Sequence, residues 1–150
     1  MHRGGLSAVP TPKLFGVEIP FVAHLGFELV KMEGGESELR FAPKHEHMNS
    51  FLVTHGGAIM TLLDVTLATA ARSLDLDTGV VTIEMKTTFM QPCQGVLTGK
   101  GRLMHRTKSM AFTEGTVYDP EGRACAHATG TFKYVRRHAP TAPANAISTD

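Results

Sequence analysis

A long apolar segment without proline constrains the fold more than any other feature of this chain. From Ala58 to Leu74 the residues are almost continuously apolar, and Asp64 is the only acidic residue among them. A segment of this length is typical of a helix, and a helix without a continuous polar face is expected to be covered on nearly every side. We therefore predict a buried central helix that starts after Thr54, whose hydroxyl would cap it, and ends near residues 75–79.

The remaining sequence is patterned as strands joined by turns, after a short helix or turn at residues 19–24. Two mostly alternating segments, residues 26–32 and 36–41, flank Gly34-Gly35, which predicts a hairpin. Four further strands are expected in succession, at residues 80–90, 95–106, 110–119 and 123–135. About five to six antiparallel strands and one helix predict an α+β domain in which a curved sheet wraps around the helix.

Length and composition fit one globular domain. The chain has 150 residues, of which 42% are hydrophobic and 19% are charged. This length is enough for one core and too short for two domains of ordinary size. Glycine and proline near the start, and proline with small residues near the end, predict flexible tails at residues 1–14 and 137–150 around a domain at residues 15–136.

Charge and hydropathy argue against two classes of partner. The formal net charge is +1, so no broad electropositive surface is expected to bind nucleic acid. The apolar segment at residues 58–74 is interrupted by polar side chains, and no N-terminal signal segment is visible. We expect a soluble, cytoplasmic protein that does not bind membranes.

Cysteine and histidine spacing gives no indication of a cofactor. Cys93 and Cys125 lie far apart and lack the paired spacing of a zinc or redox motif, which predicts reduced, structural thiols. His45 and His47 form an HxH pattern without an acidic or cysteine partner at ligand spacing, so we expect loop histidines and no metal.

Asp64 is the first candidate for chemistry. An ionised carboxylate among apolar neighbours loses hydration worth several kcal/mol unless another group compensates it. A structural explanation is that Asp64 accepts hydrogen bonds from loop backbone or from a threonine. A functional explanation is a catalytic carboxylate in a site. This residue alone leaves both open.

Gly56 and Gly57, at the expected helix start, are the second candidate. Because glycine has no Cβ atom, a ligand can approach the backbone N–H groups here, so Gly56 N–H could bind a carbonyl or an oxyanion. A tight entry from loop to helix is the structural alternative. On one helix Gly56 and Asp64 would lie about 12 Å apart along the axis and about 80° apart around it. If both serve one reaction, the carboxylate must come from a second copy, which predicts a homodimer with two shared sites.

The ordered combination of Asn49, His55-Gly56-Gly57 and Asp64 resembles the hotdog-fold acyl-CoA thioesterases of the phenylacetate-pathway, or PaaI-like, type. The similarity runs from about residue 26 to residue 134. It includes Thr82, where relatives carry serine or threonine, and the segments at residues 89–92 and 122–132.

The resemblance implies a role for each of these residues in hydrolysing an acyl-CoA, aromatic or medium-chain, to free acid and CoA. Gly56 N–H would polarise the thioester carbonyl, and Asp64 would act as general base or as nucleophile. Asn49 would hold the water or the carboxylate, His55 would position the loop or the thioester, and Thr82 would lie near the catalytic water.

The resemblance also implies where CoA binds and how the chains assemble. Basic residues near a turn of the meander would hold the CoA phosphates, which here points to Arg106, Lys108 and Ser109, with Gly57 at the helix start. The chains would form a homodimer and then a tetramer as a dimer of dimers. Two alternatives remain: a hotdog hydratase or dehydratase using a histidine base, and a non-catalytic acyl-CoA binding module.

Overall fold

The computed structural model describes residue 15 and residues 17–137. The predicted tails at residues 1–14 and 137–150 lie outside this range except for Arg137. The described elements, in chain order, are α2 (Pro20–Leu25), β1 (Glu28–Glu33), β2 (Glu36–Phe41), the 3-10 turn η2 (His45–His47), α3 (Gly56–Arg72), β3 (Thr78–Phe89), β4 (Leu97–Arg106), β5 (Met110–Tyr118) and β6 (Ala124–Arg136).

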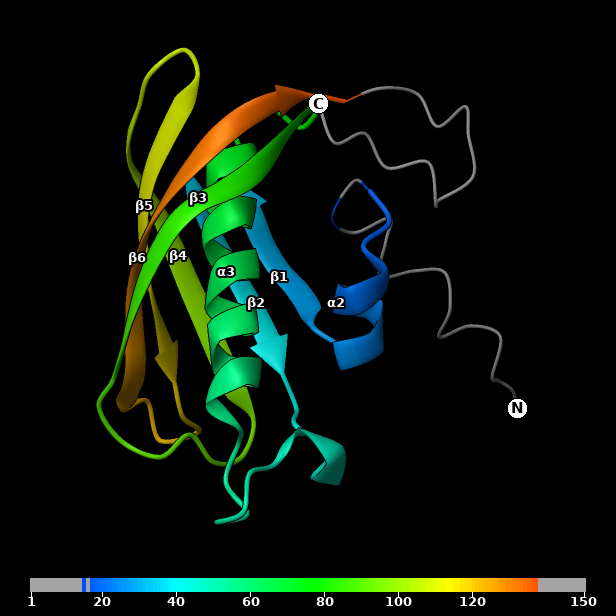
Figure 1. Cartoon of the computed structure of the whole chain (residues 1–150), viewed down its shortest axis with the longest axis vertical. Helices are drawn as coiled ribbons and strands as arrows, with labels where there is room; N and C mark the ends of the chain where they lie inside the picture. Colours follow the sequence, from blue (N-terminus) through cyan, green and yellow to red (C-terminus); the bar gives the residue numbers. More distant parts are fainter. Residues whose placement is uncertain (1–14, 16, 138–150) are drawn as a thin grey trace.

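The six strands form one antiparallel sheet in the order β1-β2-β4-β5-β6-β3. Figure 1 shows this sheet curving around α3, the one long helix. The predicted α+β architecture is therefore confirmed, and every strand end lies within two residues of its predicted position. The helix ends earlier than predicted, at Arg72, whose buried guanidinium donates to the carbonyls of Phe15, Leu76 and Thr78.

The helix is seated closely on the middle of the sheet. Leu62, Leu63 and Leu67 are fully buried on the side that faces the strands. Close contact is possible because β4 carries Gly101 beneath the helix, where a Cβ atom would lie only 2.8 Å from the Thr66 carbonyl oxygen. Ser37 Oγ on β2 donates a 2.6 Å hydrogen bond to the same oxygen.

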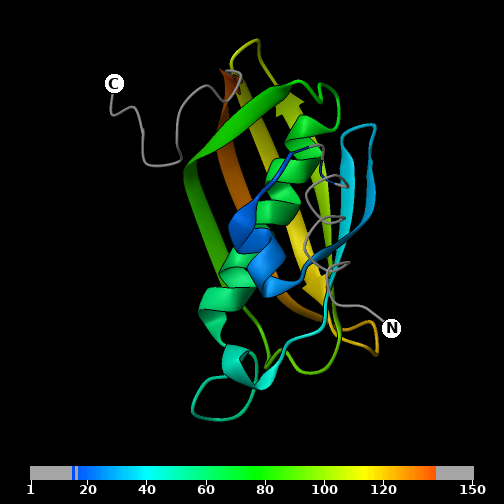
Figure 2. The ribbon, with the colours of Figure 1, turned by 90° about the vertical axis from the view of Figure 1, so that its right-hand side faces the viewer.

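The opposite side of α3 is open in a single chain. An exposed or half-exposed stripe runs along it, formed by Gly57, Met60, Thr61, Asp64 and Ala68. These residues recur at helical spacing, so they share one face. The short helix α2 lies over part of this side, as Figure 2 shows. The prediction of a helix covered on nearly every side is therefore wrong for one chain. It failed because three of the five stripe residues are small or apolar, so the sequence does not distinguish this face from the buried one.

Strand β3 forms one edge of the sheet and carries a bulge. Thr82 pairs with Phe132 and Glu84 pairs with Thr131, which leaves Ile83 as the extra residue. The edge strand β3 is long and partly apolar, since Val81 and Ile83 are 45% and 55% exposed. Exposed edges of this kind are ready to pair with another strand.

The close seating of α3 predicts a stability effect at Gly101. A Cβ atom there would also lie 2.6 Å from Ser37 Oγ. We expect Gly101→Ala to lower the free energy of unfolding by about 1–3 kcal/mol, because the helix must shift away from the sheet. Urea denaturation measures the change. Gly79→Ala on β3 is the control, since its nearest atoms would lie 3.4 Å away. Equal midpoints for the two variants would contradict this packing.

Candidate active site

Asp64 lies in an open pocket between α2, α3 and β3. The pocket has a volume of about 420 Å³ and is lined by Ile19, Phe21, Val22, Met60, Thr61, Asp64, Val65, Thr82 and Met85. Asp64 Oδ1 accepts a 2.7 Å hydrogen bond from Thr82 Oγ1. The carboxylate is only partly buried in one chain. Its second oxygen remains available to a ligand.

The bulge in β3 explains how Thr82 reaches the carboxylate. Regular alternation would turn residues 82 and 84 to the same face, which would aim Glu84 at the apolar helix. The extra residue Ile83 resets the alternation, so that Thr82 and Met85 both face α3 and Glu84 faces outward. The sequence predicts Thr82 as a site residue and gives no indication of the bulge, since residues 80–85 contain no glycine or proline.

His55, and not Thr54, caps the helix. His55 Nδ1 accepts a 2.8 Å hydrogen bond from Gly57 N–H. This fixes the neutral ring with its proton on Nε2. Thr54 lies before the cap, where its N–H donates to the Cys93 carbonyl and its buried hydroxyl has no partner in the described part of the chain. The predicted Thr54 cap is therefore wrong, because the chain turns into the helix one residue later.

The two glycines at the helix start differ in what they offer a ligand. Gly57 N–H is already bound by His55, so any contact of Gly57 with CoA would depend on its small size. A Cβ atom on Gly57 would lie 3.0 Å from His55 Nδ1. Gly56 N–H has no partner among the residues that the structure describes, and it lies at the positive end of the helix dipole.

Gly56 opens into a second pocket, of about 350 Å³. Asn49 also lines it, together with Phe89, Met90 and Pro92. The Asn49 side-chain oxygen accepts hydrogen bonds from the N–H groups of Phe51 and Val53, at 2.8 and 3.3 Å. Asn49 therefore shapes the loop before the helix, and only its amide nitrogen remains for the predicted contact with water or carboxylate.

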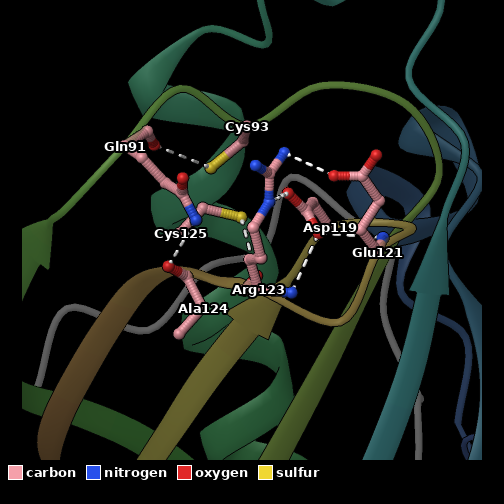
Figure 3. Close-up of polar contacts among 7 residues, drawn as sticks. All are labelled: Gln91, Cys93, Asp119, Glu121, Arg123, Ala124 and Cys125. Carbon is pink, nitrogen blue, oxygen red and sulfur yellow. Dashed lines mark hydrogen bonds and ion pairs between the residues drawn. The ribbon is translucent and has the colours of Figure 1, made fainter.

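Figure 3 shows a polar cluster beside the second pocket, which Gln91 and Cys93 also line. Cys93 and Cys125 are free and buried there, as predicted. Burial raises the pKa of Cys93 to about 12, and a hydrogen bond with Cys125 adds to the effect. Asp119 binds Arg123 through a 3.0 Å ion pair, and the backbone N–H of Arg123 lowers the pKa of the Asp119 carboxyl. Burial raises the pKa of Cys125 as well, so both thiols are poor nucleophiles.

The predicted CoA-binding turn lies far from the helix start within one chain. It joins β4 to β5 at the end of the molecule where α3 finishes, while Gly56 lies at the other end (Figure 1). The Arg106 guanidinium packs over the Tyr134 ring at 4.3 Å from its centroid. Lys108 and Ser109 are exposed. One chain therefore does not bring these residues to Gly56.

Within one chain four of the candidate residues divide between two pockets that share no lining residue. Asp64 and Thr82 belong to one, and Asn49 and Gly56 belong to the other.

Of the two histidines predicted to lie in a loop, His45 is exposed and His47 is buried. His47 Nδ1 accepts from the Lys44 N–H at 2.9 Å. Among the residues that the structure describes, no group of three histidine, cysteine or acidic side chains is placed to hold a metal ion.

No helix in the described part of the chain is long and apolar enough to span a membrane.

Comparison with solved structures gives the class of this fold. A conserved protein of Pseudomonas aeruginosa superimposes with a TM-score of 0.77 at 25% identity, covering 84% of this chain and 100% of that one. The E. coli PaaI protein of the phenylacetic acid degradation operon superimposes with a TM-score of 0.74 at 18% identity, covering 79% and 86%. The fold is the hotdog fold, as predicted.

Sequence relatives and a family model then identify the family. The model of the thioesterase superfamily matches residues 51–126. A Saccharolobus solfataricus protein, named provisionally as an esterase, is 30% identical over 75% of each chain. The proofreading thioesterase EntH of Klebsiella pneumoniae is 32% identical over 72% of this chain and 80% of its own. The chain belongs to the thioesterase superfamily and is a thioester hydrolase.

The helix cap predicts a non-additive stability effect. Because His55 Nδ1 is the cap, His55→Ala should lower the free energy of unfolding by about 1 kcal/mol. Gly57→Ala should have a similar effect, since its new Cβ would displace the ring. The double variant should lose no more than either single one. Urea denaturation tests this, with Gly56→Ala as control because its Cβ would make an ordinary 3.5 Å contact with Phe89. Additive losses would exclude this cap.

Proposed function

We propose that this protein hydrolyses an acyl-CoA thioester to a free acid and CoA, with Asp64 as the catalytic carboxylate. The 2.7 Å hydrogen bond from Thr82 to Asp64 is the observation that carries this proposal. It orients one carboxylate inside a pocket whose other side chains are apolar or are threonines. A partly desolvated carboxylate of fixed orientation can take a proton from water or attack a carbonyl directly.

In the general-base form, Asp64 removes a proton from water while the water oxygen bonds to the thioester carbon. The carbonyl oxygen becomes an oxyanion, and Gly56 N–H stabilises it. The intermediate then expels the CoA thiolate, which leaves the free acid. In the nucleophilic form, Asp64 displaces the thiolate first and water hydrolyses the mixed anhydride. In both forms Thr82 keeps the carboxylate aimed at the substrate.

Gly56 can act on the same carbonyl only if it comes from a second chain. The β3 edge and the open stripe of α3 adjoin one another and are both partly apolar, so they suit a two-fold contact. In a two-fold pair with antiparallel helices, Gly56 lies level with the partner's Asp64 when the axis passes near Met60. Met60 belongs to the open stripe and is 41% exposed.

The same two-fold arrangement gives the basic turn a role. Two chains that run in opposite directions place the β4–β5 turn of one toward the helix start of the other. Arg106, Lys108 and Ser109 could then bind the phosphates of a CoA whose thioester lies at the shared site. Association of two such dimers into a tetramer is part of the same proposal.

The geometry disfavours a hydratase or dehydratase with a histidine base. Such a base needs an unprotonated ring nitrogen directed at the substrate. His55 Nδ1 is occupied by Gly57 N–H, and Nε2 carries the proton. Membership of a hydrolase family likewise favours turnover over passive acyl-CoA binding.

The proposal predicts that Asp64→Asn loses most activity and keeps the fold. We expect kcat for release of CoA to fall by about 10²–10⁴-fold, because the amide can still accept from Thr82 and cannot act as a base. A thiol reagent measures release from a panel of acyl-CoAs. Asp77→Asn, an exposed carboxylate beyond the end of α3, is the control and should retain the wild-type rate.

Two results would count against this function. A wild-type protein that binds acyl-CoAs and releases no CoA from any of them would be a binding module. An Asp64→Asn variant as active as wild type would remove Asp64 from the chemistry.

A further inference from the structure

The pocket around Asp64 has a chemical character that the proposed function does not specify. Three elements enclose it: α2 contributes Phe21, α3 contributes Met60, and β3 contributes Met85. Val22 and Leu25 are buried and anchor α2 on the core, which leaves the Phe21 ring directed to the outside at 56% exposure. A large aromatic side chain held on an anchored helix beside a reactive carboxylate forms a wall of the site.

The polar side chains in this pocket have their donor hydrogens committed. Thr61 Oγ1 donates to the Gly57 carbonyl at 2.9 Å, and Thr82 Oγ1 donates to Asp64 at 2.7 Å. Asp64 itself is an acceptor when ionised. The other lining side chains are hydrocarbon, aromatic or thioether groups. No side chain that lines the pocket therefore has a free hydrogen to donate to a ligand.

The composition of this pocket suits the acyl group of an acyl-CoA better than the rest of the molecule. The pantetheine arm carries amide carbonyls that need hydrogen-bond donors when they leave water, and the nucleotide carries phosphates that need cations. A hydrocarbon acyl group needs neither. The two methionines add an adaptable, polarisable surface for such a group.

On this basis, and resting on the proposed function, we infer that the pocket between α2, α3 and β3 receives the acyl group. We further infer that this group is a hydrocarbon chain or ring without a second carboxylate, and that Phe21 is a specificity-determining residue. A terminal carboxylate would find no side-chain donor and no cation in the pocket and would lie near the Asp64 charge, which repels it.

A matched pair of substrates tests the inference. Hexanoyl-CoA and adipoyl-CoA have acyl chains of the same length and differ by a terminal carboxylate. We expect kcat/KM to favour hexanoyl-CoA by at least about tenfold, since removing an unpaired carboxylate from water is unfavourable. Equal values, or a preference for adipoyl-CoA, would overturn the inference.

A charge introduced at Phe21 assigns the effect to this pocket. Phe21→Lys places a cation at the wall and should raise the ratio of adipoyl-CoA to hexanoyl-CoA kcat/KM by about tenfold. Val30→Lys is the matched control, because Val30 is also 56% exposed and lies on β1 outside the pocket. The ratio cancels any general attraction of CoA to added positive charge.

The outcomes are distinguishable from failure of the proposed function. If wild type hydrolyses hexanoyl-CoA and the two lysine variants give the same ratio, Phe21 does not contact the acyl group and the inference is wrong. If wild type hydrolyses neither of these substrates nor phenylacetyl-CoA, the proposed function fails and the inference fails with it.

Discussion

The seating of α3 on the sheet is the constraint on which the other features of this molecule depend. Gly101 lets the helix approach β4 closely, and Ser37 fixes its backbone through the Thr66 carbonyl. This contact buries the leucines Leu62, Leu63 and Leu67 of α3. What remains is a single stripe that the sheet cannot cover, and Asp64 lies on it. The carboxylate is thus held on a helix that packs against the sheet, on the side of that helix that stays open to a ligand.

Much of this arrangement follows from residue patterns. The uninterrupted apolar helix, the alternating strands and the turn sequences predict a sheet around a helix, because each pattern has one economical way to bury its apolar side. Asp64, Gly56 and Thr82 were also identified from the sequence, partly by physical argument and partly by resemblance. The spacing of Gly56 and Asp64 on one helix indicated that a single chain separates them, and the two pockets of the structure are consistent with that separation.

Other features could not be predicted, for reasons that are physical. The cap at His55 depends on where the chain turns into the helix, and Thr54 is the better capping residue by type. The bulge at Ile83 depends on which residues of β6 face β3, which no local pattern in β3 encodes. The open face of α3 depends on the width of the sheet, and its apolar residues resemble those of the covered face. Each of these is set by tertiary packing.

In the proposed dimer, each site uses Gly56 from one chain and Asp64 from the other. Gly56→Pro removes the N–H at little expected cost to the helix: Gly56 is the first helical residue, where proline is favoured, and His55 already has the extended ψ of 138° that precedes proline. Chains with Gly56→Pro and chains with Asp64→Asn should each be almost inactive as homodimers. Co-expressed with different tags and purified through both, they form mixed dimers in which one site is intact and the other carries both substitutions. A shared site predicts about half of wild-type activity per mixed dimer. A mixed dimer no more active than either parent would contradict it.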